Sequence, residues 1–527
     1  MNNRFFIGTI FSAAALLSSL PFQGKNLVIL HTNDTHSNID IASDGTGGVL
    51  PRKAIIDSVR NAEKNVILVD AGDIVQGTLY FNFFRGDVEY PLLNMLGYDI
   101  RILGNHEFDN GLKELADHWK KVKGDRLSAN YDFENTPAKG LFKPYVIRNV
   151  EGKKIGFIGI NIDPASMISE ENYKGMKYKD ALETANHYAR VLKKDKKCDL
   201  VVAVTHIGYT TDVDKSTDID IARNSRDIDI IIGGHSHSLV NPDTPDVTPY
   251  LFPNLDGKEV MVVQTGKYGK NLGYINIDLD KIGKATPEYR LIPVTDRFDA
   301  GTYDKEIIDF LAPYRTKVDS VYNNPVGYSS ISMNNNERSG AYANWAGDFA
   351  LWYGSQAARS LNDAENKDIK VDFGMMNVGG IRQPMQEGVI TEGQILSTFP
   401  FSNSIQLIRL KGKDFIDAMK VAASKGGEAI SSNLRVVTDK EGEVTVIYNN
   451  RPLDPEKDYV LATIDYIANG NDGLSSLARH EMIWRDNQIV NTRILDYIKS
   501  LVMLGLPLQS DPSPRFIYHN EKQVDKT

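Results

Sequence analysis

Residues 27–36 read LVILHTNDTH, an apolar run that ends in a cluster of polar side chains. Its first four residues have the length and composition of a buried strand. The same pattern recurs up to about residue 280, in the apolar runs 66–69, 100–103, 155–160, 200–204 and 228–232. Stretches typical of helices, at 51–63, 111–121 and 178–192, lie between several of these runs. Strands that alternate with helices predict a layered α/β domain.

Polar side chains cluster where five of the predicted strands end. The five segments are TNDTH at 32–36, DAGD at 70–73, GNHEFD at 104–109, TH at 205–206 and GGHSH at 233–237. They hold five of the ten histidines of the chain, and we interpret the other five as structural or solvated. Ligands of such sheets bind beyond the carboxyl ends of the strands, so we expect the segments to converge on one site.

The side chains in these segments are ones that bind transition metals. Taken singly, a strand-end Asp is often a helix cap and a lone His is often structural. Together, imidazole, carboxylate and amide oxygen ligands suit Zn, Mn, Fe or Co better than Ca or Cu. The candidate ligands are too many for one tetrahedral ion and suit a pair about 3.5–4 Å apart. Asp73, in its Gly-Asp turn, is the natural bridge between two divalent ions.

The charge balance of such a pair favours a phosphate ester as the substrate. Two divalent ions carry four positive charges, and the carboxylates of Asp34 and Asp73 neutralise two of them. The remaining charge matches a phosphate dianion, and a bridging hydroxide would be the attacking species.

The order Asp-x-His, Gly-Asp, Gly-Asn-His-Glu, His, Gly-His-x-His resembles that of the calcineurin-like metallophosphoesterases. The longer forms GNHEFDNG at 104–111 and IIGGHSHS at 231–238 resemble the 5'-nucleotidase branch of that family. The resemblance implies a four-layer α/β/β/α sandwich for the first domain and a pair of divalent ions (Zn, Mn, Co or Fe). It also implies seven ligands: Asp34, His36 and His237 on one ion, Asn105, His206 and His235 on the other, and Asp73 between them. Some relatives have Gln at the position of His237.

His106 and Asp109 are the predicted catalytic pair. Family members use this His as a charged group at the transition state, and the Asp orients it. A spacing of three residues at the start of a helix places both side chains on one side. Phosphoryl transfer develops negative charge that a nearby cation stabilises. The alternative is that Asp109 only caps the following helix. Relatives that prefer 2',3'-cyclic nucleotides often have Asn at this position, so the Asp here favours nucleoside monophosphates as substrates.

A second motif set follows residue 324, in a predicted α/β segment with helices at 343–361, 413–423 and 492–504 and strands at 406–410, 443–448 and 459–463. Its segments are NVGGIR at 377–382, FPFSN at 399–403 and DYIANGNDG at 465–473. Alone, these aromatics would be core residues and these glycines ordinary turns. Together they resemble the C-terminal substrate domain of 5'-nucleotidases. The resemblance implies that Phe401 and Tyr466 clamp the base, Asp472 binds the ribose, and Asn377 and Arg382 contact the nucleotide. Arg338 is a candidate for a further arginine.

The predicted organisation has five parts: a signal peptide at 1–23, the metallophosphoesterase domain at 24–300, a linking helix at 301–323, the substrate-binding domain at 324–515 and a polar tail at 516–527. Arg4 precedes the apolar run 5–20, which is short for a membrane span and is broken by Pro21. We expect an exported protein, periplasmic or secreted, without a membrane anchor after signal cleavage. The alternatives are an uncleaved anchor and a buried first helix.

Composition excludes several classes of protein. The chain has 527 residues, 24% of them charged, which argues against a disordered chain and a polytopic membrane protein. The net charge of -9 argues against electrostatic binding of nucleic acid, and the single Cys198 excludes an intrachain disulfide.

From the motifs and the resemblance we predict an exported dinuclear-metal phosphohydrolase that releases phosphate from nucleoside 5'-monophosphates through a metal-bound hydroxide. The alternatives are a UDP-sugar or dinucleotide pyrophosphatase, a 2',3'-cyclic-nucleotide phosphodiesterase, and a non-catalytic nucleotide-binding surface protein. The oligomeric state is left open.

Overall fold

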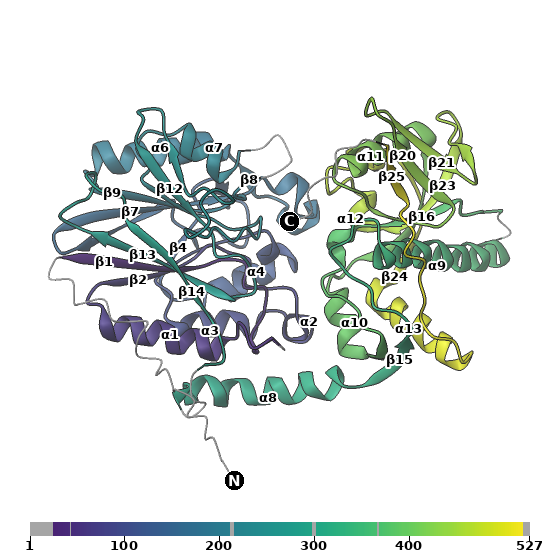
Figure 1. Cartoon of the computed structure of the whole chain (residues 1–527), viewed down its shortest axis with the longest axis horizontal. Helices are drawn as coiled ribbons and strands as arrows, with labels where there is room; N and C mark the ends of the chain where they lie inside the picture. The colour runs from purple at the N-terminus through teal and green to yellow at the C-terminus, as the bar shows by residue number, and fades with distance from the viewer. Residues whose placement is uncertain (1–24, 43, 211–215, 298–301, 366–367, 520–527) are drawn as a thin grey trace, which may run out of the picture.

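The chain folds into two α/β domains that are joined by a long helix, α8 (Lys305–Tyr322) (Figure 1). This computed structural model describes residues 25–519 apart from 43, 211–215, 298–301 and 366–367. The predicted signal peptide at 1–23 lies outside the described residues. No helix among the residues described is long and apolar enough to span a bilayer.

The first domain is built around two six-stranded sheets. The first sheet has the order β14 (Glu288–Pro293), β13 (Asn271–Asp278), β1 (Asn26–Thr32), β2 (Val66–Asp70), β3 (Ile100–Ile102) and β4 (Asp125–Leu127). Its strands β1 to β4 run parallel, while β13 and β14 are antiparallel additions. The second sheet has the order β11 (Leu251–Pro253), β12 (Glu259–Val263), β10 (Ile230–Ile232), β9 (Leu200–His206), β7 (Lys153–Asn161) and β6 (Tyr145–Val150).

Alternation along the strands produces four layers. In β1, Leu27 and Ile29 belong to the core between the two sheets, whereas Val28 and Leu30 belong to the core under the helices. That outer core is covered by α1 (Val49–Ala62), α3 (Glu89–Leu96) and α4 (Gly111–Trp119). On the other side, α6 (Ala181–Arg190) and α7 (Asp218–Arg223) cover the second sheet. The predicted four-layer α/β/β/α sandwich is confirmed.

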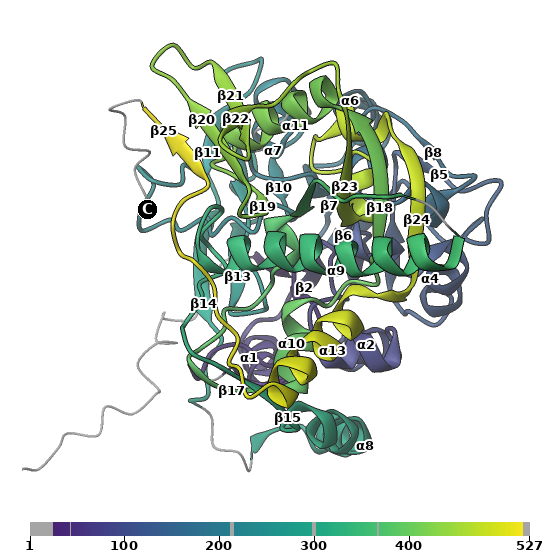
Figure 2. The same ribbon diagram turned by 90° about the vertical axis from the view of Figure 1, so that its right-hand side faces the viewer.

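The second domain has a five-stranded sheet and a four-stranded one. The larger has the order β19 (Ala429–Ile430), β16 (Phe373–Met376), β23 (Asp458–Ile464), β18 (Ser404–Lys411) and β24 (Glu481–Ile489). The smaller has the order β22 (Arg451–Pro452), β21 (Val444–Tyr448), β20 (Leu434–Thr438) and β25 (Phe516–Tyr518). Helix α9 (Ala341–Glu365) crosses the larger sheet at Gly354, where an added Cβ would meet the Cβ of Ala462 at 2.4 Å (Figure 2). Helices α11 (Gly412–Ser424) and α13 (Val490–Met503) add apolar side chains to the same core.

The C-terminal segment departs from the sequence prediction. We expected a polar tail from residue 516, but Phe516–Tyr518 form β25, which pairs with β20 in parallel. Phe516 is 3% exposed and belongs to the core of the second domain. The ordered part of that domain therefore extends at least to Tyr518, because a buried aromatic side chain outweighs the polar composition around it.

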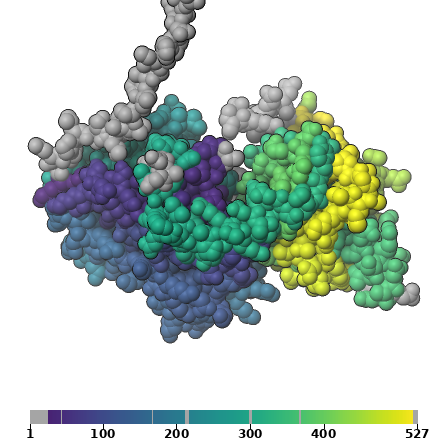
Figure 3. Space-filling model, turned by 90° about the horizontal axis from the view of Figure 1, so that it is seen from below, coloured from purple at the N-terminus to yellow at the C-terminus, as the bar shows by residue number. Residues whose placement is uncertain are grey.

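The two domains also touch beside the linking helix. The apolar side of α8 packs into the first domain through Ile307 and Leu311. The side-chain amide of Asn82, in α2 (Leu79–Phe84), donates a hydrogen bond of 3.2 Å to the carbonyl of Leu396, in α10 (Glu392–Thr398). Seen from below, α8 lies along the surface from one domain to the other (Figure 3). This arrangement holds the second domain's loops against the strand ends of the first.

Candidate active site

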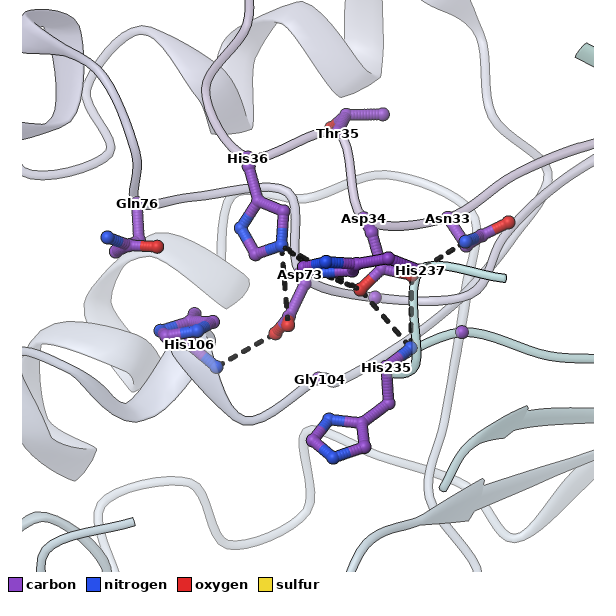
Figure 4. A network of polar contacts seen from close by, with 12 residues as sticks. Asn33, Asp34, Thr35, His36, Asp73, Gln76, Gly104, His106, His235 and His237 are labelled. Carbon is purple, nitrogen blue, oxygen red and sulfur yellow. Dashed lines mark hydrogen bonds and ion pairs between the residues drawn. The ribbon is translucent and has the colours of Figure 1, made fainter. Parts of the chain in front are cut away.

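The seven proposed metal ligands all lie where parallel strands end. Asp34 and His36 follow β1, Asp73 follows β2, Asn105 follows β3, His206 ends β9, and His235 and His237 follow β10. Because these strands are parallel within their sheets, their carboxyl ends meet at one edge. The structure brings all seven side chains together there, and Figure 4 shows five of them.

The carboxylate of Asp73 lies between the two halves of this cluster. Its Oδ2 atom is 3.1 Å from Nε2 of His206 and 3.9 Å from Nε2 of His36. Its Oδ1 atom accepts a hydrogen bond of 2.8 Å from the backbone N–H of His106. One carboxylate oxygen thus faces an imidazole from each proposed half-site, which is the geometry that a bridging ligand requires.

The remaining proposed ligands form two groups on either side of Asp73. In the first, Nε2 of His237 is 2.9 Å from Nε2 of His36 and 3.5 Å from Oδ1 of Asp34. In the second, Nδ1 of His235 lies 2.9 Å from Oδ1 of Asn105. Nitrogen and oxygen donors that converge in this way fit a pair of divalent transition-metal ions.

The fixed orientation of His206 shows how the backbone prepares a ligand. Its Nδ1 atom lies 2.7 Å from the carbonyl oxygen of Ala71. Because a carbonyl oxygen can only accept, Nδ1 donates this hydrogen bond, and Nε2 is the ring atom that faces Asp73 and is available as a ligand when it is deprotonated. The side chain is fully buried, so this orientation is not lost to solvent.

The loops that carry the ligands adopt unusual backbone conformations. Five of the seven proposed ligands have positive φ angles between 47° and 80°: Asp34, His36, Asp73, His235 and His237. Such conformations are uncommon for residues other than glycine and cluster at functional sites. Gly104 allows the close approach of two loops, since an added Cβ would lie 2.2 Å from Oδ1 of Asp73. Holding these side chains in place therefore costs conformational free energy.

Burial and the two carboxylates set the charge of the cluster. Burial lowers the pKa of His36 and of His237 well below the usual value, so both imidazoles are neutral, the form that binds metal. Burial raises the pKa of Asp34 to about 7. Burial opposes the charged form of His206, yet the neighbouring carboxylate of Asp73 raises the pKa of this histidine to about 10. A buried cluster of this kind needs positive charge beside its carboxylates.

His106 and Asp109 lie next to the cluster and contact each other. Nδ1 of His106 is 3.0 Å from Oδ2 of Asp109. We expected this pair at the start of a helix; instead, His106–Phe108 form a single 3₁₀ turn, and α4 begins later, at Gly111. Side chains three residues apart align in a 3₁₀ turn, so the contact is kept. Burial opposes the charged imidazole, but Asp109 and Asp73 raise the pKa of His106 above its usual value.

The second domain reaches this same point through Arg382 and Phe401. Nη2 of Arg382 lies 3.5 Å from Nε2 of His106 and 3.5 Å from Oε1 of Gln76. The guanidinium carbon of Arg382 is 5.2 Å from the centre of the Phe401 ring, which is 5.9 Å from the imidazole of His106. A cation and a half-buried aromatic ring from one domain therefore adjoin the proposed metal cluster of the other.

Tyr466, Asp472 and Asn377 form a second group of contacts. The hydroxyl of Tyr466 donates a hydrogen bond of 2.9 Å to Oδ1 of Asp472. The side-chain amide of Asn377 donates one of 3.1 Å to Oδ2 of the same carboxylate. A carboxylate has about four acceptor positions, so Asp472 can still accept from two adjacent hydroxyl groups of a ligand.

Comparison with known proteins decides the family. The profile for calcineurin-like phosphoesterases matches residues 27–239, and the profile for the 5'-nucleotidase C-terminal domain matches residues 341–479. The chain belongs to the 5'-nucleotidase family. It is accordingly a metal-dependent phosphoric ester hydrolase that acts on nucleotides.

Relatives of the family match nearly the whole chain. A 5'-nucleotidase from Vibrio parahaemolyticus is 28% identical over 91% of this chain and 92% of its own length. A 5'-nucleotidase from Rattus norvegicus is 28% identical over 92% of this chain and 91% of its own length. The crystal structure of a 5'-nucleotidase precursor from Thermus thermophilus superposes with a TM-score of 0.79 at 28% identity, and covers 94% of this chain and all of that one.

The structure adds supporting residues that the motifs of the 5'-nucleotidase family did not reveal. Asp218 accepts hydrogen bonds from Thr205 (2.6 Å) and Gln264 (2.9 Å), and Gln264 also donates to the carbonyl of Gly234 (3.0 Å). Thr205 and Gly234 directly precede His206 and His235, so one buried carboxyl group ties two ligand-bearing segments together. Asn33 likewise donates to Oδ2 of Asp34, at 2.6 Å.

The candidate Arg338 lies near the nucleotide contacts of the second domain. Its guanidinium pairs with Glu428 and donates a hydrogen bond of 3.0 Å to the carbonyl of Gly427. The same Glu428 accepts from the backbone N–H of Val378, directly after Asn377. Arg338 thus supports the loop that carries Asn377 and Arg382.

Proposed function

We propose that this protein is an exported, dinuclear-metal 5'-nucleotidase that releases phosphate from nucleoside 5'-monophosphates. The proposed ligands are Asp34, His36 and His237 for one ion and Asn105, His206 and His235 for the other, with Asp73 bridging. Divalent ions bound there supply Lewis acidity toward the phosphoryl group and lower the pKa of a water molecule. Zn, Mn, Co and Fe all suit this donor set.

The observation that carries the proposal is the contact between Arg382 of the second domain and His106 of the first. Phosphoryl transfer places growing negative charge on the equatorial and leaving oxygens. Arg382 and the imidazolium of His106, 3.5 Å apart, offer two cationic groups to those oxygens. Asp109 favours the charged form of the imidazole by raising its pKa, and it orients the ring.

The second domain supplies recognition of the nucleoside. The ring of Phe401 is only half-buried and lies beside Arg382, so a base that stacks on it has its phosphate near the metal cluster. Tyr466 provides a second aromatic face, and its hydroxyl holds Asp472 in position to accept from the ribose hydroxyl groups. Asn377 fixes the other oxygen of that carboxylate. Stacking a base on an aromatic ring contributes about 1–3 kcal/mol and tolerates any base.

Substrate preference is tested by measuring phosphate release from AMP, ATP, UDP-glucose and 2',3'-cyclic AMP, with and without a chelator. We expect AMP to have the highest kcat/KM, and chelation followed by Mn²⁺ or Zn²⁺ addition to abolish and restore activity. A higher kcat/KM for UDP-glucose or the cyclic nucleotide would assign the protein to one of the alternative activities. Activity that survives complete metal removal would contradict the metal site itself.

Export is supported by the charged start and short apolar run of residues 1–20, which lie outside the described residues. The test is N-terminal sequencing of the protein purified from the native cell envelope or medium. A mature N-terminus near residue 24 supports export with signal cleavage, whereas an intact Met1 in the cytoplasm contradicts it.

A further inference from the structure

One end of the second domain carries an unusual concentration of exposed apolar side chains. Among the residues that the structure describes, fourteen large apolar or aromatic side chains are exposed. Six of them come from β15 (Pro325–Ser329), β17 (Gly388–Thr391), the end of α13 and the turn that follows it, and we call them the apolar patch: Tyr328, Val389, Val502, Met503, Leu504 and Leu506. None of the six belongs to the proposed active site.

The members of the apolar patch are neighbours in space. Tyr328 pairs with Val389 across the two strands. An added Cβ on Gly327 would lie 3.7 Å from a methyl carbon of Val502, which places α13 against β15. The backbone N–H of Leu508 donates to the carbonyl of Tyr328 at 2.8 Å, so the chain after Leu506 returns to the same strand. Figures 1 and 2 both show α13 and β15 side by side at this end of the domain.

The exposure of the patch is not a by-product of a frayed helix end. Backbone N–H groups of Leu504 and Leu506 bond to the carbonyls of Ser500 and Leu501, and Gly505 supplies the positive φ of 68° that ends the helix. The turn is therefore ordered, yet Met503 is 82% and Leu504 is 70% exposed. Polar residues would serve this turn equally well, so its apolar side chains need another explanation.

We propose that the apolar patch is the interface of a two-fold symmetric dimer of this chain. Side chains of this size expose on the order of 150 Å² each when free, so the six present roughly 600 Å² at their observed exposures, the upper end for a monomer. Two facing copies bury roughly 1,200 Å², which reaches the lower limit of specific interfaces. A patch made only of apolar groups is complementary to itself, as an isologous contact requires.

The charges beside the patch favour a second copy over a lipid surface. Lys499 and Asp496, both exposed on α13, carry opposite signs, and exposed Glu387 precedes β17. A segment that inserts into an anionic membrane has a rim of Lys and Arg, which is lacking among the described residues here. Opposite charges at the rim can instead pair across a two-fold axis.

Sedimentation velocity of the full-length protein between about 1 and 100 µM tests the proposal. We expect a dimer in the wild-type protein and at least about a tenfold weaker dimer in Met503→Asp and, on a different element, in Val389→Asp. Val247→Asp is the matched control, because Val247 is 79% exposed but lies in the first domain. It should dimerise like the wild-type protein.

Retained AMP hydrolysis shows that each variant is folded. The proposal is overturned if the wild-type protein is monomeric over the whole range, or if both patch variants dimerise as tightly as the wild-type protein. It is also overturned if a monomeric wild-type protein binds phosphatidylglycerol vesicles and Met503→Asp does not, since the patch would then be a membrane-docking surface.

Discussion

The proposed metal ligands of the first domain and the proposed nucleotide contacts of the second are held in different ways. Asp34, Asp73 and His206 are at most 1% exposed; Asp34 and Asp73 lie in strained loops at strand ends, and His206 is the last residue of β9. Phe401 and Tyr466 are only half-buried and are placed by side-chain contacts, Phe401 with Arg382 and Tyr466 with Asp472. Chemistry that tolerates little displacement is thus built on rigid backbone, whereas recognition of a large, flat base is left to adjustable side chains.

The largest effect is expected where the difference is sharpest, at the bridging position. Asp73→Ala removes the oxygen that faces both His36 and His206, and we expect kcat to fall by at least about 10⁴-fold together with loss of bound metal. Metal content by mass spectrometry and phosphate release from AMP measure this. Asp44→Ala, an exposed carboxylate in the same domain, is the control and should change neither.

A smaller effect should follow loss of the charged group beside the cluster. His106→Ala should keep bound metal but lower kcat by roughly 10²–10⁴-fold, because the transition state loses a cation. Asp109→Asn, which removes the charge that favours the imidazolium, should also keep bound metal and should lower kcat by less than His106→Ala does. Loss of metal in His106→Ala would make this residue a ligand, and wild-type turnover would remove it from the mechanism.

Loss of a residue that holds the ligand-bearing segments in place should lower activity less than loss of a ligand. Asp218→Ala breaks the link from Thr205 to Gln264, and we expect metal affinity to fall by about 10–100-fold. Titration of the metal-depleted protein with Zn²⁺ or Mn²⁺ gives the affinity, and saturating metal should restore most of kcat. Asp243→Ala, on an exposed turn, is the control; equal affinities in both variants would show that the link does not support the site.

The smallest effect concerns one hydrogen bond in the second domain. Tyr466→Phe keeps the aromatic face but loses the bond from the hydroxyl to Asp472, which is worth about 1.5–3 kcal/mol when the acceptor is charged and less at a partly exposed site. We expect KM for AMP to rise by less than about tenfold while kcat is kept. A loss as large as that of Tyr466→Ala would mean that the hydroxyl, and not the ring, is the important group.

Sequence reasoning succeeded where the signal is local. Each strand-end segment combines a buried apolar run with a polar cluster, so the edge where Asp34, Asp73 and His206 meet could be predicted from the parallel strand order alone. The His106–Asp109 contact also follows from a short spacing, although the turn proved to be 3₁₀.

The features that were missed depend on contacts between distant segments. The aromatic stretch of α2 and the Pro91 of α3 do not look helical, but Leu79 and Leu92 are buried in the core, and Pro91 lies in the first turn, where its missing N–H costs nothing. Asp218 supports the metal site through Gln264, which is 46 residues away, and no spacing rule predicts such a contact. Strands β13 and β14 were missed because their place beside β1 is set only by tertiary pairing.

The central claim is that the proposed metal site belongs to the first domain and base recognition to the second, and Phe401→Ala tests it most directly. The measurement is kcat/KM for AMP and for ribose 5-phosphate, which shares the sugar and phosphate but has no base. We predict that the value for AMP falls by about 1–3 kcal/mol, or roughly 5- to 150-fold, while the value for ribose 5-phosphate stays within about twofold. His106→Ala should lower both values together. An equal fall for both substrates in Phe401→Ala, or no fall for either, would contradict the account.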